Sequence, residues 1–164
     1  MPKLKFHIEQ VAICPTNAAA AITLLTEMGA VSWAKDHVVA DGEVFGQLAT
    51  NEADLSFNYD LMKGGNEFEV LDYTSGPNWM DCDERRNSVS HLGMHCTDDD
   101  LENWQEFFTE RGIGVVQEVV TKSHTNPVID GKRLYNYVIF GTKAILGVDL
   151  KFIVRLEPDQ VHLD

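Results

Sequence analysis

The side chains best suited to chemistry near neutral pH are two histidines of one short stretch, because imidazole titrates in this range and binds divalent metal ions. His91 and His95 lie on the same face of a predicted apolar strand, which leads into a helix that Thr97 or Asp98 can cap and that ends at Gly112. His91 could bind a metal ion or could line a cleft as a hydrogen-bonded side chain. His95 is a candidate general acid or base, because the ordinary pKa of histidine lies near the working pH.

The stretch around His91 repeats an earlier part of the chain. The segment that begins at Gln10 reads QVAICPTN, and the segment that begins 81 residues later, at His91, reads HLGMHCTD. Each segment is a predicted strand and a cap, followed by a helix and three further strands. The chain therefore contains one unit twice, in which Gln10 corresponds to His91, and a doubled fold usually forms its site where the copies meet.

The elements of the first copy are predicted from the period of its apolar residues. A helix that ends at Gly29 carries an apolar stripe made of Ala18, Ala21, Ile22, Leu25 and Met28. The other elements are strands at 6–14, 30–35, 54–61 and 67–73, a loop at 36–45 and a glycine-containing turn at 63–66. Alternation in the last strand places Glu67 and Glu69 on one face, opposite to Val70.

The second copy follows the same order of elements. Its helix presents a bulky apolar face made of Leu101, Trp104, Phe107 and Phe108. After the strand that contains His91, further strands are predicted at 115–120, 133–140 and 145–155, with a loop at 122–127. We predict a single domain over residues 1–164, which consists of a first module at 5–73, a linker at 74–87, a second module at 88–156 and a polar tail at 157–164.

The composition argues against several classes of protein. Of the 164 residues 44% are hydrophobic and 24% are charged, which is ordinary for a domain with a buried core. The net charge of −13 argues against nucleic acid and anionic membranes as partners, because both require a basic face. Three cysteines without a CxxC pair predict no disulfide framework, and no apolar run approaches the ~18 residues of a membrane span. We therefore expect a cytoplasmic protein.

Two βαβββ modules in tandem, each opened by a strand, a cap and a helix, resemble the vicinal oxygen chelate superfamily. This group contains glyoxalase I, bleomycin-resistance proteins, methylmalonyl-CoA epimerase, fosfomycin-resistance enzymes and extradiol dioxygenases. The resemblance covers residues 6–156 and rests on the repeat and on the order of the elements. It implies a glyoxalase-like α+β fold, in which the mixed sheets of the two modules curl around a shared concave cleft. It also implies metal ligands on the first and last strands of each module.

The resemblance places four residues of this chain in the cleft. Gln10 and His91 occupy the first-strand positions, and Glu69 and Lys151 occupy the last-strand positions, 82 residues apart. Gln10, Glu69 and His91 match the metal ligands of the family, since glyoxalase I can carry glutamine at the first position. Lys151 departs from the pattern, because the family's metalloenzymes usually have glutamate there and a protonated lysine has no lone pair for a metal ion.

Two functions are consistent with this pattern. The first is a glyoxalase-like lyase or isomerase, in which Gln10, Glu69 and His91 hold a divalent metal ion (Zn, Ni, Mn or Fe) that acts as a Lewis acid on a small oxygen-rich substrate. Lys151 would then stabilise an oxyanion, and His95 would be a further catalytic candidate. The alternative is a metal-free protein of the bleomycin-resistance type, which sequesters a small molecule. In that case Glu69 and Lys151 form an ion pair across the cleft.

The resemblance also bears on other activities and on assembly. Extradiol dioxygenase chemistry uses two histidines and one carboxylate, so Gln10 and Lys151 argue against it. Family members of this length often dimerise, and we therefore expect a homodimer. The cleft could be completed by the partner chain or could close within one chain, and the sequence leaves both arrangements open.

Overall fold

A computed structural model describes residues 4–77, 88–122 and 134–156 of the chain. The predicted linker lies outside these residues from position 78 onward, and the predicted tail at 157–164 lies outside them entirely. Within the described ranges, no helix is both long enough and apolar enough to cross a membrane.

Each half of the chain contains one main helix and four strands. The first half consists of β1 (Gln10–Cys14), α1 (Ala18–Glu27), β2 (Trp33–Val44), β3 (Gln47–Asn58), a 3-10 turn η1 (Lys63–Gly65) and β4 (Glu67–Ser75). The second half consists of β5 (Ser88–Cys96), α4 (Asp98–Thr109), β6 (Val115–Lys122), β7 (Leu134–Phe140), the short helix α5 (Lys143–Leu146) and β8 (Asp149–Leu156).

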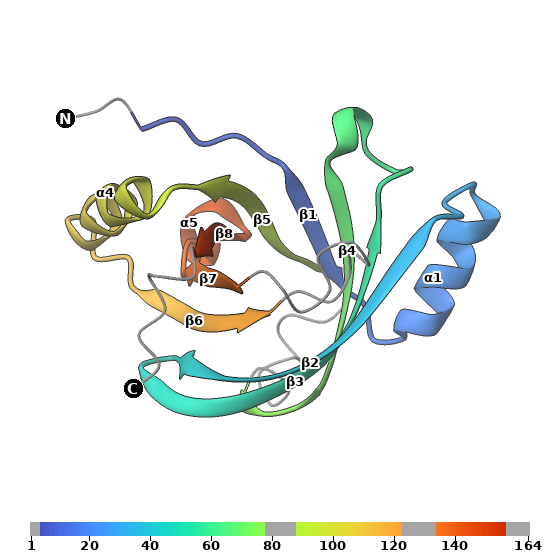
Figure 1. The fold of residues 1–164 in the computed structure, drawn as a ribbon, viewed down its shortest axis with the longest axis horizontal. Coiled ribbons are helices and arrows are strands. Elements are labelled where there is room, and N and C mark those ends of the chain that lie inside the picture. The colour runs from blue at the N-terminus through green and yellow to red at the C-terminus, as the bar shows by residue number, and fades with distance from the viewer. Residues whose placement is uncertain (1–3, 78–87, 123–133, 157–164) are drawn as a thin grey trace.

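The eight strands of the described residues form one closed barrel, in the order β1-β4-β3-β2-β6-β7-β8-β5. Within each half the first strand pairs in parallel with the last, β1 with β4 and β5 with β8. The halves join twice, through the antiparallel pairs β1–β5 and β2–β6 (Figure 1). The predicted α+β fold is therefore confirmed, and the two sheets meet at both edges to make a single mixed barrel. Its interior is the shared concave surface.

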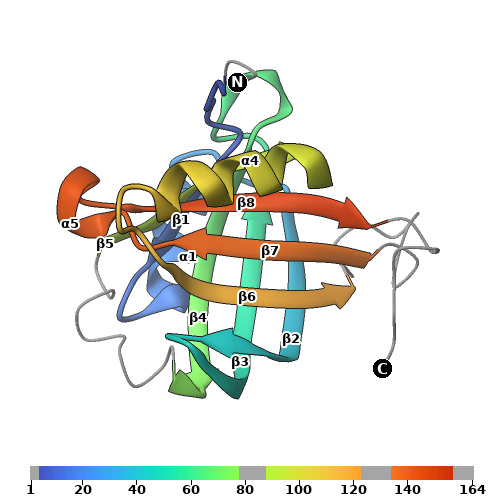
Figure 2. The same ribbon diagram turned by 90° about the vertical axis from the view of Figure 1, so that its left-hand side faces the viewer.

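The larger apolar core lies in the second half, between α4 and the outer face of the strands, and Figure 2 shows α4 lying along β8. Its buried members are Met94, Leu101, Trp104, Phe108, Val138, Phe140, Leu150, Phe152 and Val154. The rings of Trp104 and Phe108 stack with centroids 5.8 Å apart, and those of Phe108 and Phe140 at 4.4 Å. The bulky helix face predicted from the sequence supplies this core, with Phe107 packed at its edge.

The first half is held together differently. Its cluster of buried apolar residues lies on the inner face of the barrel. The members come from β1, β3 and β4 and are Ala12, Cys14, Ala53, Leu71 and Tyr73. None of the residues of α1 is buried, and the exposed fraction of Met28, just after the helix, reaches 70%. The apolar stripe predicted on this helix therefore does not become a buried face.

The loop predicted at 36–45 is wrong, because these residues belong to the long hairpin of β2 and β3. The pair Asp41-Gly42 looked like a turn, but Gly42 lies inside β2, where β6 passes so close that a side chain at this position would clash with the backbone of Glu118 and with Val119. The actual turn is made by Phe45 and Gly46, whose φ angles are 49° and 75°.

Other strand boundaries also differ from the sequence prediction. The strands expected at 30–35 and 54–61 are β2 at Trp33–Val44 and β3 at Gln47–Asn58. The first strand was expected at 6–14, but pairing begins only at Gln10. The last strand was expected at 145–155, but Lys143–Leu146 form α5, and the strand starts at Asp149. Gly147, with a φ of 75°, ends this short helix in the left-handed conformation that glycine adopts without strain.

Candidate functional site

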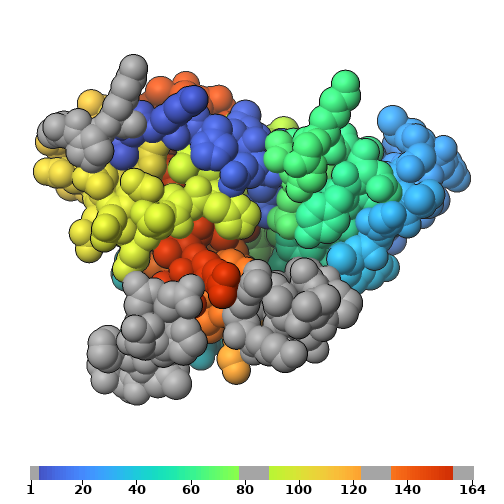
Figure 3. Space-filling model, turned by 45° about the horizontal axis from the view of Figure 1, so that its top comes forward, coloured from blue at the N-terminus to red at the C-terminus, as the bar shows by residue number. Residues whose placement is uncertain are grey.

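The barrel encloses a cavity of about 280 Å³, which is lined by side chains from all eight strands. The lining combines apolar and aromatic side chains with polar ones. One polar group, on β1, β4, β5 and β8, consists of Gln10, Glu67, Glu69, His91 and Lys151, and further polar side chains lie on β2, β3 and β6. The chain before β1 lies between β5 and β4, because the Glu9 backbone N–H donates to Gly93 and the Glu67 N–H donates to Glu9. Figure 3 shows this N-terminal segment in blue, between the yellow-green start of the second half and the green end of the first.

Strand pairing brings the four predicted cleft residues together inside the barrel. Ala12 on β1 pairs with Glu69 on β4 and also with His91 on β5, and Gly93 pairs with both Gln10 and Lys151. Gln10, Glu69, His91 and Lys151 are all buried, and all of them line the cavity.

Three of these side chains make close polar contacts. His91 Nε2 lies 2.9 Å from Gln10 Oε1 and 3.2 Å from Glu69 Oε2. Glu69 Oε2 also lies 3.8 Å from Lys151 Nζ, which is the ion pair that the metal-free hypothesis predicts. Gly93 makes room for this arrangement, because a Cβ atom there would approach Gln10 Oε1 to 3.0 Å.

Burial and charge set the protonation states of this group. Burial lowers the pKa of His91, and the positive charge of Lys151 lowers it further, so the imidazole is neutral at neutral pH. Burial acts to raise the pKa of Glu69, but the attraction of Lys151 and of His91 outweighs it and holds that pKa below its ordinary value. The group is therefore a carboxylate and an ammonium beside a neutral imidazole and an amide.

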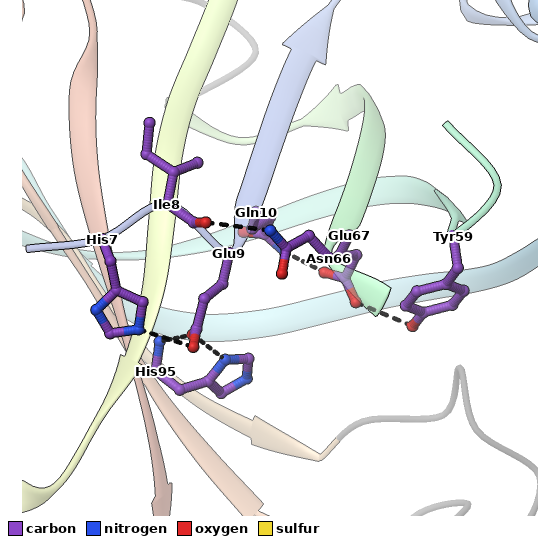
Figure 4. Close-up of polar contacts among 8 residues, drawn as sticks. All are labelled: His7, Ile8, Glu9, Gln10, Tyr59, Asn66, Glu67 and His95. Carbon is purple, nitrogen blue, oxygen red and sulfur yellow. Dashed lines mark hydrogen bonds and ion pairs between the residues drawn. The ribbon is translucent and has the colours of Figure 1, made fainter. Parts of the chain in front are cut away.

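His95, the other predicted catalytic residue, lines the rim of the cavity and not its polar floor. Its Nδ1 lies 2.9 Å from Glu9 Oε2, and its backbone N–H donates to the same oxygen at 2.6 Å. Glu9 also meets His7 Nε2 at 2.9 Å, so its carboxylate lies between two imidazoles (Figure 4). The side chain of His95 is 60% exposed, and no described contact joins it to the group around His91.

Sequence reasoning missed a second carboxylate in the cavity, Glu67. Its Oε1 accepts a hydrogen bond from Gln10 Nε2 and its Oε2 accepts one from the Tyr59 hydroxyl at 3.0 Å (Figure 4). Burial raises the pKa of Glu67, and the negative charge of Glu69 adds to the rise. The signal was present in the sequence, because alternation puts Glu67 on the same strand face as Glu69.

Aromatic side chains of the cavity were also missed. Tyr59, Tyr135 and Tyr137 line the wall, and the rings of Tyr135 and Tyr137 stack with centroids 5.9 Å apart. Lys151 Nζ lies 4.9 Å from the centre of the Tyr137 ring, within the range of a cation–π contact. The cavity thus already holds an ammonium group against a tyrosine face.

Comparison with known proteins gives structural similarity only. No protein-family model and no curated protein matches the sequence. The structure is similar to methylmalonyl-CoA epimerase from Mycobacterium tuberculosis, with a TM-score of 0.52 and 12% identity over 92% of this chain and 88% of that chain. It is also similar to an epimerase variant from Streptomyces coelicolor solved with 2-nitronate-propionyl-CoA, with a TM-score of 0.52 and 13% identity over 90% and 93% of the two chains.

A triple mutant of 4-hydroxymandelate synthase from Streptomyces coelicolor aligns with a TM-score of 0.57 and 12% identity over 92% of this chain, which spans 49% of the length of that protein. Methylmalonyl-CoA epimerase and 4-hydroxymandelate synthase are vicinal oxygen chelate proteins. The fold of this chain is the vicinal oxygen chelate fold. The resemblance inferred from the repeat is thereby confirmed at the level of the fold.

Vicinal oxygen chelate proteins typically depend on a divalent metal, but the side chains at this site do not fit one. Among the described residues, no three His, Cys, Asp or Glu side chains are arranged to hold a metal ion. The donor nearest to the expected position, Glu69 Oε2, already faces the ammonium of Lys151 at 3.8 Å. The positive charge of Lys151 therefore occupies the position where a metal ion would have to compete for the Glu69 carboxylate.

Proposed function

We propose that the protein binds a small organic molecule in the barrel cavity without a metal ion. The observation that carries this proposal is the ion pair between Lys151 Nζ and Glu69 Oε2, 3.8 Å apart inside the closed barrel. The positive charge that a metal ion would bring to this position is supplied by a side chain. The polar group around His91 then orients a ligand and does not activate it as a Lewis acid would.

The lining of the cavity supports a small-molecule ligand. Binding sites for small molecules are concave and mostly apolar, with a few polar groups that fix the orientation of the ligand. Here apolar side chains such as Leu55 and Val119 share the wall with Tyr135 and Tyr137, and several polar groups meet around His91. The epimerase variant of similar fold was solved with a CoA ester analogue, which agrees with a ligand site inside such a fold.

The metal-dependent lyase or isomerase stays a prediction, and one observation favours it. Gln10 Oε1 and Glu69 Oε2 both lie within 3.2 Å of His91 Nε2, so three atoms that could bind a metal ion are close together. The two hypotheses differ in the metal content of the purified protein, which decides between them directly.

The first experiment measures metal content by mass spectrometry on tag-free protein, before and after dialysis against Zn, Ni, Mn or Fe. We expect far less than one metal ion per chain. The Lys151→Glu variant replaces the ammonium with a carboxylate and should gain a stoichiometric metal ion, because Glu69 and His91 then lack the competing positive charge. Stoichiometric metal in the wild-type protein would overturn the proposal.

The second experiment measures thermal stability across a library of small aromatic and polar compounds. A compound that binds the native state at 100 times its Kd stabilises it by about 2.7 kcal/mol. The control is Ala53→Leu, which fills part of the cavity from its wall without changing any charge. Compounds that stabilise the wild-type protein and the Ala53→Leu variant equally bind elsewhere, and a library made up only of such compounds would argue against a ligand in the barrel.

We also propose that the expected homodimer, if it forms, leaves the site unchanged. The cavity is lined by strands of one chain that closes into a barrel, so no partner chain is needed to complete it. Light scattering gives the oligomeric state, and ligand affinity that is independent of protein concentration across the dimer's dissociation range would agree with this arrangement.

A further inference from the structure

Glu67 is a half-buried carboxylate in the cavity wall, and the groups that contact it are neutral. Its two oxygens accept hydrogen bonds from the Gln10 amide and from the Tyr59 hydroxyl, and among the described residues it forms no ion pair. A carboxylate oxygen has two lone-pair positions, so each Glu67 oxygen keeps room for a further donor. Buried charges in proteins are normally paired, because the loss of hydration is otherwise uncompensated.

The charges around Glu67 leave a negative excess in the cavity. When Glu67 is ionised, Glu67 and Glu69 carry two negative charges and Lys151 carries one positive charge, while His91 and Gln10 are neutral. Asp36 and Lys122, which also line the cavity, offset each other. One additional positive charge would balance the group, whereas a divalent ion would leave it positive.

Glu69 supplies a second, independent sign that a donor is missing. Its Oε2 is fully buried and makes no aligned hydrogen bond with a described residue, although His91 and Lys151 lie nearby. Gln10 Oε1 lies closer to His91 Nε2, at 2.9 Å, than Glu69 Oε2 does, at 3.2 Å. A buried acceptor without a hydrogen bond favours a ligand that can donate one from an N–H group.

We propose that the cavity recognises an organic monocation, an ammonium, amidinium or guanidinium group on a small aromatic or aliphatic body, with its charged end on Glu67 and Glu69. The body lies against the tyrosine wall, where Tyr137 already faces the ammonium of Lys151 at 4.9 Å. Leu55, Phe57 and Leu71 make the rest of the wall apolar, which favours an organic cation over a hydrated metal ion. This proposal rests on the proposed binding function and names its ligand class.

The test compares pairs of probes that have the same shape and different charge, by calorimetry on the full-length, tag-free protein. Benzamidine is compared with neutral benzamide, and phenethylamine with phenethyl alcohol and with phenylacetate. We expect the cations to bind more tightly than their neutral and anionic counterparts. We expect Glu67→Gln to weaken benzamidine binding about tenfold to hundredfold, because a hydrogen bond to a charged group contributes roughly 1.5–3 kcal/mol.

The matched control is Glu102→Gln, which removes one negative charge from an exposed position of α4, outside the cavity. It should leave the affinity for benzamidine unchanged. A second readout is the conservative variant Glu67→Asp, which keeps the carboxylate and should still bind benzamidine more tightly than benzamide. Glu67→Gln should lose that preference, so the proposal does not depend on one variant alone.

The outcomes separate the two proposals. Neutral and cationic probes that bind equally well, or a preference for the anion, would overturn the recognition of a cation and leave binding in the barrel intact. An unchanged benzamidine affinity in Glu67→Gln would also overturn it. A set of probes that the Ala53→Leu variant binds as tightly as the wild-type protein would instead contradict the proposed function itself.

Discussion

The two halves of the barrel have the same order of elements, yet they contribute different things to the molecule. In the second half α4 covers the strands and buries Leu101, Trp104 and Phe108 in an aromatic core. In the first half α1 buries no residue, and the apolar cluster faces the cavity. We infer that the second half supplies most of the stability of the fold and that the first half shapes the cavity.

The same contrast holds in the last strand of each half. β4 places Glu67 and Glu69 on its inner face, and the corresponding positions of β8 hold Asp149 and Lys151. Asp149 is buried outside the cavity lining, where it accepts a hydrogen bond from the Lys143 backbone N–H at 3.0 Å. The Asp149 carboxylate therefore binds the first residue of α5. The other three charged groups, Glu67, Glu69 and Lys151, line the cavity.

The largest predicted difference between the two halves is the loss of stability when a side chain is truncated in each. Phe152→Ala should lower the free energy of unfolding by about 3–5 kcal/mol, because Phe152 is fully buried and contacts the rings of Trp104, Phe108 and Phe140. Leu24→Ala in α1 should cost less than about 0.5 kcal/mol, since Leu24 is 58% exposed. Urea denaturation measures both, and similar costs would contradict the division of roles.

The position of the site in the sequence could be predicted because the resemblance implies ligands on the first and last strands of each module. The repeat then matched Gln10 with His91 and Glu69 with Lys151, and alternation supported the inward direction of Glu69 and Lys151. The structure places all four in one cavity. Their chemical roles are a separate matter and stay predictions, because a role depends on distances and charges that alternation does not give.

The contacts of the site could not be predicted, because they depend on the register between strands. Gln10 lies opposite Glu67 on β4 and opposite Gly93 on β5, and neither pairing can be read from local sequence. The same limit explains the wrong loop at 36–45. Gly42 allows β6, a segment that is distant in the sequence, to pack closely against β2.

The second prediction concerns the charge that distinguishes β8 from β4. Lys151→Met should lower the free energy of unfolding by about 3 kcal/mol, because it leaves Glu67 and Glu69 buried without a cation. The double variant Glu69→Gln/Lys151→Met should recover most of this loss, since the uncompensated charge is removed with its partner. Equal losses in the single and double variants would show that packing of the lysine stem, and not its charge, matters.

The third prediction tests whether the ionised carboxylate of Glu67 on β4 lowers the stability of the fold. The pKa of Glu67 is raised in the folded protein, so the native state retains its proton at low pH and loses stability as pH rises through that pKa. Glu67→Gln does not titrate and keeps an acceptor for Gln10. It should therefore be more stable than the wild-type protein at mildly alkaline pH, by on the order of 1 kcal/mol, and the difference should shrink toward acidic pH.

Thermal unfolding across this pH range measures the difference, with Glu102→Gln as the control for a charge lost outside the cavity. A variant that is less stable than the wild-type protein at every pH would mean that Glu67 supports the fold. In that event the excess negative charge would not be a feature kept for a ligand.

The smallest effects are expected at the two helix caps. The cap hydrogen bonds of the two halves are alike, but their loss should affect the global stability differently. The Asn17 side chain accepts from Ala20 N at 2.9 Å, and the Thr97 hydroxyl accepts from Asp100 N at 3.1 Å. Replacing either residue by alanine removes about 1 kcal/mol of local helix stability. Because α4 is buried against the core, Thr97→Ala should lower the global free energy of unfolding by that amount. Because no residue of α1 is itself buried, Asn17→Ala should instead speed hydrogen exchange within α1 alone, and a matching global loss would mean that α1 is coupled to the barrel after all.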